Sequence, residues 1–131
     1  MPLTVIELSQ VAQSTGGYPL AAFEFVREGL GHTVETIHGE TDDYASSHHV
    51  SGQQLCLGLR DHAINKFGML APAVLDSWNI HRTDDFGRIV FAMIDHGLMS
   101  KASQDTVDDF CGVYDFAEAF NPCQLAMHIG N

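Results

Sequence analysis

The sequence predicts a mostly α-helical, compact domain. Apolar residues recur at intervals of three and four along several stretches, capping residues stand just before these stretches, and glycines follow them. The length of 131 residues corresponds to one domain, and an apolar share of 45% is enough for a packed core. We therefore expect a single domain over 1–131, divided into an amino-terminal helical pair (1–37), a linker loop (38–49), a helical core (50–120) and a tail (121–131).

Two helices are expected at the amino end. Thr4 and Glu7 have the spacing of a capping box, and Gly16 and Gly17 end the first helix because glycine tolerates the left-handed conformation. Pro19 opens the second helix, where its missing N–H costs nothing. The apolar stripe of this second helix consists of Phe23, Val26, Leu30, Val34 and Ile37.

A third helix is expected from residue 51 to residue 67. Ser51 and Gln54 form a second capping box at its start, and Gly68 ends it. Its apolar face consists of Leu55, Leu59, Ala63 and Phe67, with Cys56 and Ile64 beside them.

Two further helices are predicted at 70–78 and 83–98. Thr83 is the expected N-cap of the longer one, where Asp84 and Asp85 favour the positive end of the helix dipole. The positions that fall off its apolar stripe are Asp84, Asp85, Arg88, Ala92 and Asp95.

Residues 99–102 and 111–116 have compositions that allow short strands, and residues 115–120 could form a last helical turn. Three helices with a tight turn between the last two, followed by two strands, is the pattern of a helix-turn-helix with a wing. Because other three-helix arrangements give the same spacing, the sequence leaves two folds open. One is a winged-helix-like core with a small two-stranded wing, and the other is a different helical arrangement.

The charge balance excludes several functions. Lys and Arg number 6 and Asp and Glu number 17, which gives a net charge of −11 and repels phosphate backbones and anionic lipids. The longest apolar run, from Ile89 to Ile94, is far shorter than the roughly 20 residues that span a bilayer. No signal-peptide pattern is visible. We therefore expect no nucleic-acid partner, no membrane association and a cytoplasmic location.

Sequence motifs for catalysis are absent. The chain has no G-x-S-x-G elbow, no phosphate-binding glycine loop and no H-E-x-x-H pattern. Arg60, Asp61 and His62 point about 100° apart on a helix, so they cannot converge on one atom, and Arg60 is expected to pair with an acid from another segment. No catalytic residue and no cofactor is predicted, and an enzyme of unrecognised type is only a third hypothesis.

Histidine and cysteine offer weak metal and disulfide candidates. His48 and His49 lie in the polar linker, where neighbouring acids could help them to bind a metal ion, but no metal-ligand spacing supports this, so a solvated loop is the preferred interpretation and no metal site is predicted. Cys56, Cys111 and Cys123 form no C-x-x-C pair, so we expect reduced thiols. A disulfide between Cys111 and Cys123 stays open.

The turn before the longer helix is the predicted interaction surface, formed by Trp78, His81, Arg82 and Asp85. Tryptophan and arginine are common anchors of protein interfaces. The alternative is that Trp78, together with Ile80, belongs to the core.

Several stretches resemble an uncharacterised bacterial family of small helical proteins, a domain of unknown function. They are YPLAAFEFVREGL, HVSGQQLCLGLRDHAINKFG, WNIHRTDDFGRIVFAMI and GVYDFAEAF. The resemblance covers residues 18–120. It implies a single compact domain, and it brings no activity and no site residues.

Two functions follow as hypotheses. The first is a non-enzymatic protein–protein interaction module with an acidic surface, whose partner is another protein or a second copy of the chain. The second is a small-molecule or metal-binding protein that uses the histidine-bearing loop 38–49.

Overall fold

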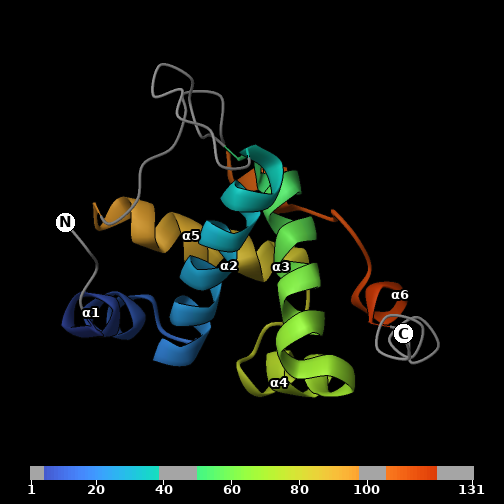
Figure 1. The fold of residues 1–131 in the computed structure, drawn as a ribbon. Helices are drawn as coiled ribbons and strands as arrows, with labels where there is room; N and C mark the ends of the chain where they lie inside the picture. Colours follow the sequence, from blue (N-terminus) through green and yellow to red (C-terminus); the bar gives the residue numbers. More distant parts are fainter. Residues whose placement is uncertain (1–4, 39–49, 98–105, 121–131) are drawn as a thin grey trace.

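The computed structural model describes residues 5–38, 50–97 and 106–120. In chain order the elements are α1 (Val5–Thr15), α2 (Leu20–His38), α3 (Gly52–Phe67), the short 3₁₀ helix η1 (Gly68–Leu70), α4 (Ala71–Ser77), α5 (Thr83–Asp95), the 3₁₀ helix η2 (Val107–Phe110) and α6 (Phe116–Ala119). Figure 1 shows α2 and α3 side by side, with α5 crossing behind both. The prediction of a mostly helical chain is confirmed.

The predicted wing is not supported, because the described part of the chain contains no strand. Residues 111–115 form a turn that leads into α6, which begins at Phe116. Gly112 has a left-handed φ of 59°, which interrupts an extended chain, and the Val113 N–H donates to the Thr83 hydroxyl (3.1 Å) instead of to a second strand. The other predicted strand, 99–102, lies outside the described residues.

The capping signals at the start of α3 and at the end of α1 are confirmed. At the start of α3, the Gln54 N–H donates to Ser51 Oγ (3.1 Å), and the Ser51 N–H donates to Gln54 Oε1 (3.0 Å). Gly16 and Gly17 follow α1 with φ values of 70° and 83°. Thr4 lies outside the described residues.

The predicted role of Thr83 is wrong. Arg82 is the capping residue of α5, and the Asp85 carboxylate accepts its N–H. Thr83 is fully buried, and its hydroxyl donates to the carbonyl of Phe110 (2.6 Å). The hydroxyl therefore links the end of η2 to α5. A buried polar group needs a hydrogen-bond partner, and the Phe110 carbonyl is that partner.

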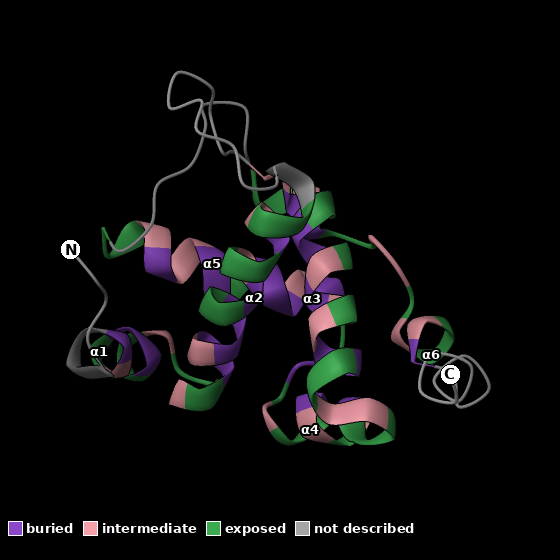
Figure 2. Ribbon diagram, viewed as in Figure 1, coloured by how far each residue is buried: buried purple, intermediate pink, exposed green. Residues whose placement is uncertain are grey.

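The core lies where α2, α3 and α5 meet, and the buried residues in Figure 2 concentrate there. Phe23 and Val26 of the predicted α2 stripe are buried, as is Phe25, which that stripe did not include. From α5 the core receives Phe86, Ile89 and Met93. Its further buried members include Leu8, Val11, Leu55, Leu59, Leu75 and Ile80.

Two glycines allow α2 and α3 to approach closely. A Cβ atom at Gly58 would overlap the Thr33 hydroxyl and would lie 2.9 Å from Thr33 Cβ. A Cβ atom at Gly29 would overlap a methyl group of Leu59. The spacing of these two helices therefore depends on the absence of a side chain at both positions.

Candidate functional site

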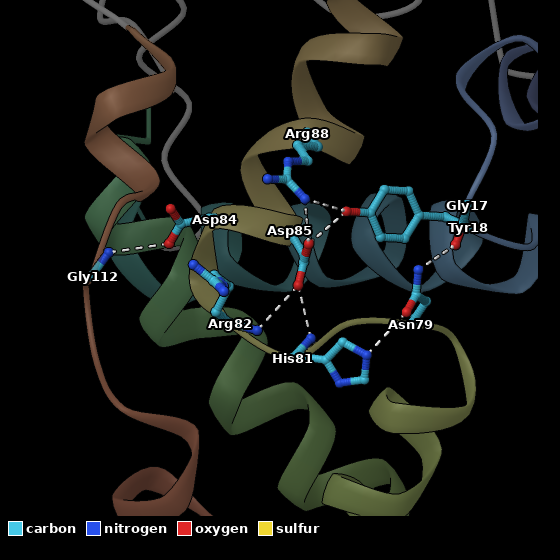
Figure 3. Close-up of polar contacts among 9 residues, drawn as sticks. All are labelled: Gly17, Tyr18, Asn79, His81, Arg82, Asp84, Asp85, Arg88 and Gly112. Atoms are coloured by element: carbon cyan, nitrogen blue, oxygen red, sulfur yellow. Dashed lines mark hydrogen bonds and ion pairs between the residues drawn. The ribbon is translucent and has the colours of Figure 1, made fainter.

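The buried Asp85 carboxylate links three parts of the chain (Figure 3). Its Oδ1 accepts hydrogen bonds from the Tyr18 hydroxyl (2.6 Å) and from Arg88 Nη1 (3.1 Å). Its Oδ2 accepts the backbone N–H groups of His81 (2.8 Å) and Arg82 (3.2 Å). Asp85 is only 5% exposed, so these four donors compensate for the loss of water around it.

This arrangement is structural rather than catalytic. Burial, followed by the hydrogen bond to Asp85, raises the pKa of the Tyr18 phenol, so Tyr18 stays a neutral donor. A general base needs an acceptor that faces the proton it removes, whereas both oxygens of Asp85 are already occupied. Asp85 therefore joins the α1–α2 connection and the Asn79–Arg82 turn to α5.

The turn before α5 is held by further side chains. Asn79 adopts a left-handed φ of 65°, its Nδ2 donates to the carbonyl of Gly17 (3.1 Å), and its Oδ1 lies 3.0 Å from His81 Nε2. The other ring nitrogen of His81 lies 3.1 Å from a carboxylate oxygen of Asp76. These contacts fix the backbone that presents His81 and Arg82 at the surface.

The structure separates the four predicted surface residues. The Trp78 ring is partly buried, and its centroid lies 5.5 Å from that of Phe25 and 5.8 Å from that of Phe67. Ile80 is 1% exposed and belongs to the core. Asp85 is buried, so only His81 and Arg82 lie at the exposed surface.

A hollow of about 580 Å³ opens beside His81 and Arg82. We call it the α5–α6 hollow, and the residues that line it are His81, Arg82, Asp84, Gly112, Tyr114, Asp115, Phe116 and Ala117. One side comes from the start of α5, and the other comes from the segment between η2 and α6.

The second side of the hollow is built by hydrogen bonds and ring contacts. The Tyr114 hydroxyl donates to the carbonyl of Cys56 on α3 (3.0 Å), and the Tyr114 and Phe116 rings stack at 5.7 Å. Asp115 caps α6 by accepting the Ala117 N–H (2.7 Å). Burial raises the pKa of Tyr114 and raises the pKa of the neighbouring Cys56 to about 12, so both groups are neutral at physiological pH.

Asp84 contributes a charged group to the hollow. Burial pushes the pKa of Asp84 upward, but hydrogen bonds from the Cys111 thiol and the Gly112 N–H outweigh this effect and hold it below its ordinary value. The Gly112 N–H lies 3.4 Å from Asp84 Oδ1 (Figure 3). The carboxylate is therefore ionised at neutral pH and available to a cationic group.

The sequence indicated a candidate strand over residues 111–116 and a candidate last helical turn over 115–120. The helical turn is confirmed as α6, with Asp115 as its N-cap, but the sequence did not predict that the aromatic rings of this segment line a hollow beside α5. No local pattern brings these residues beside Arg82, because this proximity arises from the packing of η2 on α5.

We expect replacement of Thr83 with valine to detach this side of the hollow. Valine keeps the shape but removes the donor to Phe110 and the acceptor for Val113, so the free energy of unfolding should fall by about 1–3 kcal/mol. Denaturant unfolding measures the change. Thr83→Ser keeps the hydroxyl and serves as the control, and equal losses in both variants would contradict this role of the hydroxyl.

Other predicted residues have different outcomes. Arg60 bonds to its neighbour Asp61 (Nη2 to Oδ1, 3.1 Å), and within the described ranges it has no ion pair with an acid of another segment. Over 5–38, 50–97 and 106–120, no group of three His, Cys, Asp or Glu residues could hold a metal ion. His48, His49 and Cys123 lie outside these ranges, so the metal and disulfide predictions on them stay untested.

Comparison with known proteins gives no match to a family model, to a curated protein or to a solved structure. The resemblance to a bacterial family therefore stays a prediction. Among the described helices, none has both the length and the apolar character needed to cross a bilayer.

Proposed function

We propose that the chain is a non-enzymatic protein–protein interaction module that binds a basic segment of a partner protein at the α5–α6 hollow. The observation that carries this proposal is the composition of the hollow, which combines two stacked aromatic rings with the carboxylates of Asp84 and Asp115. A lysine or arginine side chain can lay its apolar stem on such rings while its charge meets a carboxylate.

The charge around the hollow supports a basic partner. The described residues of 81–120 carry two arginines, Arg82 and Arg88, and Nη1 of Arg88 lies 3.1 Å from Asp85. The acids of the same stretch are Asp84, Asp85, Asp95, Asp108, Asp109, Asp115 and Glu118. A negative surface of this kind accelerates encounter with a positive partner, and salt screens the attraction.

The same charge argues against a second copy of the chain as the occupant. Each copy carries a net charge of −11, so two acidic faces would repel each other. The first experiment is therefore light scattering of the purified chain at low ionic strength. We expect a monomer. A stable dimer that becomes tighter in the Asp115→Asn variant would overturn the proposal of a basic partner in favour of self-association.

Two single-charge variants test the partner binding in opposite directions. Asparagine at position 115 keeps the cap of α6 but removes a negative charge, whereas Arg82→Gln removes the positive charge from the hollow. The probes are synthetic lysine- and arginine-containing peptides and glutamate-containing peptides of equal length. We expect Asp115→Asn to weaken binding of basic peptides by about two- to five-fold and Arg82→Gln to strengthen it by a similar factor.

Calorimetric titration measures these affinities, and Glu35→Gln on the exposed surface of α2 provides the matched control. It removes the same charge as Asp115→Asn without touching the hollow, so we expect little change. Equal binding of basic and acidic peptides would overturn the proposal. Changes in the same direction for Asp115→Asn and Arg82→Gln would do so as well.

A further inference from the structure

Among the described residues that line the α5–α6 hollow, His81 alone belongs to a type that ordinarily changes its charge between about pH 5 and pH 8. Aspartate and arginine side chains ordinarily stay charged over this range. With a neutral His81, the lining carries one positive residue, Arg82, against two negative ones, Asp84 and Asp115. A proton on His81 adds a second positive charge and brings the two signs into balance. The attraction of the hollow for a basic segment therefore depends on one imidazole ring.

The His81 ring lies between two hydrogen-bond acceptors. Its Nε2 lies 3.0 Å from Asn79 Oδ1 (Figure 3), and its Nδ1 lies 3.1 Å from a carboxylate oxygen of Asp76. The Asn79 amide cannot turn its nitrogen toward the ring, because Nδ2 already donates to the carbonyl of Gly17 (3.1 Å). A neutral imidazole has one N–H group and donates to one of the two acceptors, whereas the protonated ring donates to both. The turn therefore accommodates the charged ring with all its hydrogen bonds satisfied.

The position of His81 lets it respond to the solution and act on the hollow. Its side chain is 52% exposed, so protons have access to the ring. Asp76 of α4 is the carboxylate in contact with the ring, and because it is 74% exposed, water weakens this ion pair and the ring's charge is not cancelled at the hollow. The His81 backbone N–H donates to the buried Asp85, which holds the residue beside Arg82. Protonation therefore changes the charge of the hollow while the backbone stays in place.

We infer that His81 is a pH-sensitive switch of the α5–α6 hollow, at which protonation of the ring releases a basic partner segment and deprotonation restores its binding. This inference rests on the proposed function, because it assigns a regulation to the same site. Protonated His81 and its chain neighbour Arg82 place two positive charges on one side of the hollow. A lysine or arginine of the partner would then meet repulsion there in addition to the attraction of Asp84 and Asp115.

The test compares the affinity of a basic peptide without histidine at about pH 8 and about pH 5.5, where carboxylates ordinarily stay ionised. About 0.15 M salt screens the distant histidines of the chain. We expect acidification to weaken binding to the native chain by about two- to five-fold more than binding to His81→Gln, whose side chain stays neutral. His81→Lys fixes the positive charge, so it should bind more weakly than the native chain at pH 8.

His96→Gln is the matched control, because His96 is exposed at the other end of α5 and does not line the hollow. This variant should keep the pH dependence of the native chain. Calorimetric titration measures the affinities, and NMR signals of the His81 ring follow its protonation directly. We expect the affinity of the native chain to change over the same pH interval as these ring signals.

The outcomes separate this inference from the function on which it rests. Basic peptides that bind at neither pH would overturn both. If they bind, an equal loss of affinity on acidification in the native chain and in His81→Gln would overturn the switch and leave the proposed binding site standing. A loss of affinity outside the pH interval in which the His81 ring titrates would also overturn the switch alone.

Discussion

Replacement of Asp85 with alanine is expected to lower the free energy of unfolding by about 3–5 kcal/mol, the cost of removing one partner from a buried charged network. The Tyr18 hydroxyl and the N–H groups of His81 and Arg82 would lose their acceptor. A buried donor without an acceptor is costly because it has lost its hydrogen bond to water. Denaturant unfolding followed by circular dichroism measures the change.

Asp95→Ala is the matched control, since it removes an acid from an exposed position of the same helix. We expect it to change the free energy of unfolding by less than about 0.5 kcal/mol. Asp85→Asn should fall between the two, because an amide keeps one acceptor oxygen and loses the charge. If Asp85→Ala were no more destabilising than Asp95→Ala, the assignment of Asp85 as a structural link would be wrong.

A methyl group at Gly58 should also destabilise the fold strongly. The Gly58→Ala change places a Cβ atom 2.9 Å from Thr33 Cβ, and Thr33 cannot move aside without a shift of the α2 backbone. Overpacking of this kind costs about 1–3 kcal/mol, which exceeds the roughly 1 kcal/mol that alanine gains over glycine in a helix.

Gly31→Ala provides the opposite expectation on the neighbouring helix. No atom lies within 4 Å of a Cβ atom built at Gly31, so the helix propensity of alanine should stabilise the chain by about 0.5–1 kcal/mol. Thermal unfolding of both variants under one set of conditions compares them. A stabilising effect of Gly58→Ala would show that α2 and α3 can separate at no cost.

The helices could be predicted because their signals are local. The capping pair Ser51 and Gln54 acts within a few residues and is confirmed. The apolar spacing that predicted a helix over 83–98 is local as well, and the helix is present as α5, which ends at Asp95. The conformation of the predicted wing residues 111–116 could not be predicted from such local signals. Strand-favouring residues in CGVYDF are outweighed by the left-handed φ of Gly112 and by the attachment to Thr83, which lies 30 residues earlier in the chain.

The candidate site shows the same division between local and distant signals. The sequence predicted that Asp84 and Asp85 lie at the positive end of the helix dipole, and both lie in the first turn of α5. That Asp85 is buried depends on Tyr18, which is 67 residues away and carries no pattern that points to it. Similarly, the proximity of Arg82 to Phe116 depends on how η2 packs against α5, so the sequence predicted one side of the hollow and missed the other.

The Tyr114 hydroxyl, which lines the α5–α6 hollow, donates to the backbone carbonyl of Cys56, a residue whose own side chain lies in the core. The sulfur of Cys56 is shielded from solvent, and its pKa of about 12 keeps it in the unreactive protonated form while α3 is covered. Chemical attack on this sulfur therefore requires the structure around α3 to open locally first. The rate at which a thiol reagent alkylates Cys56 consequently reports how often this part of the core opens.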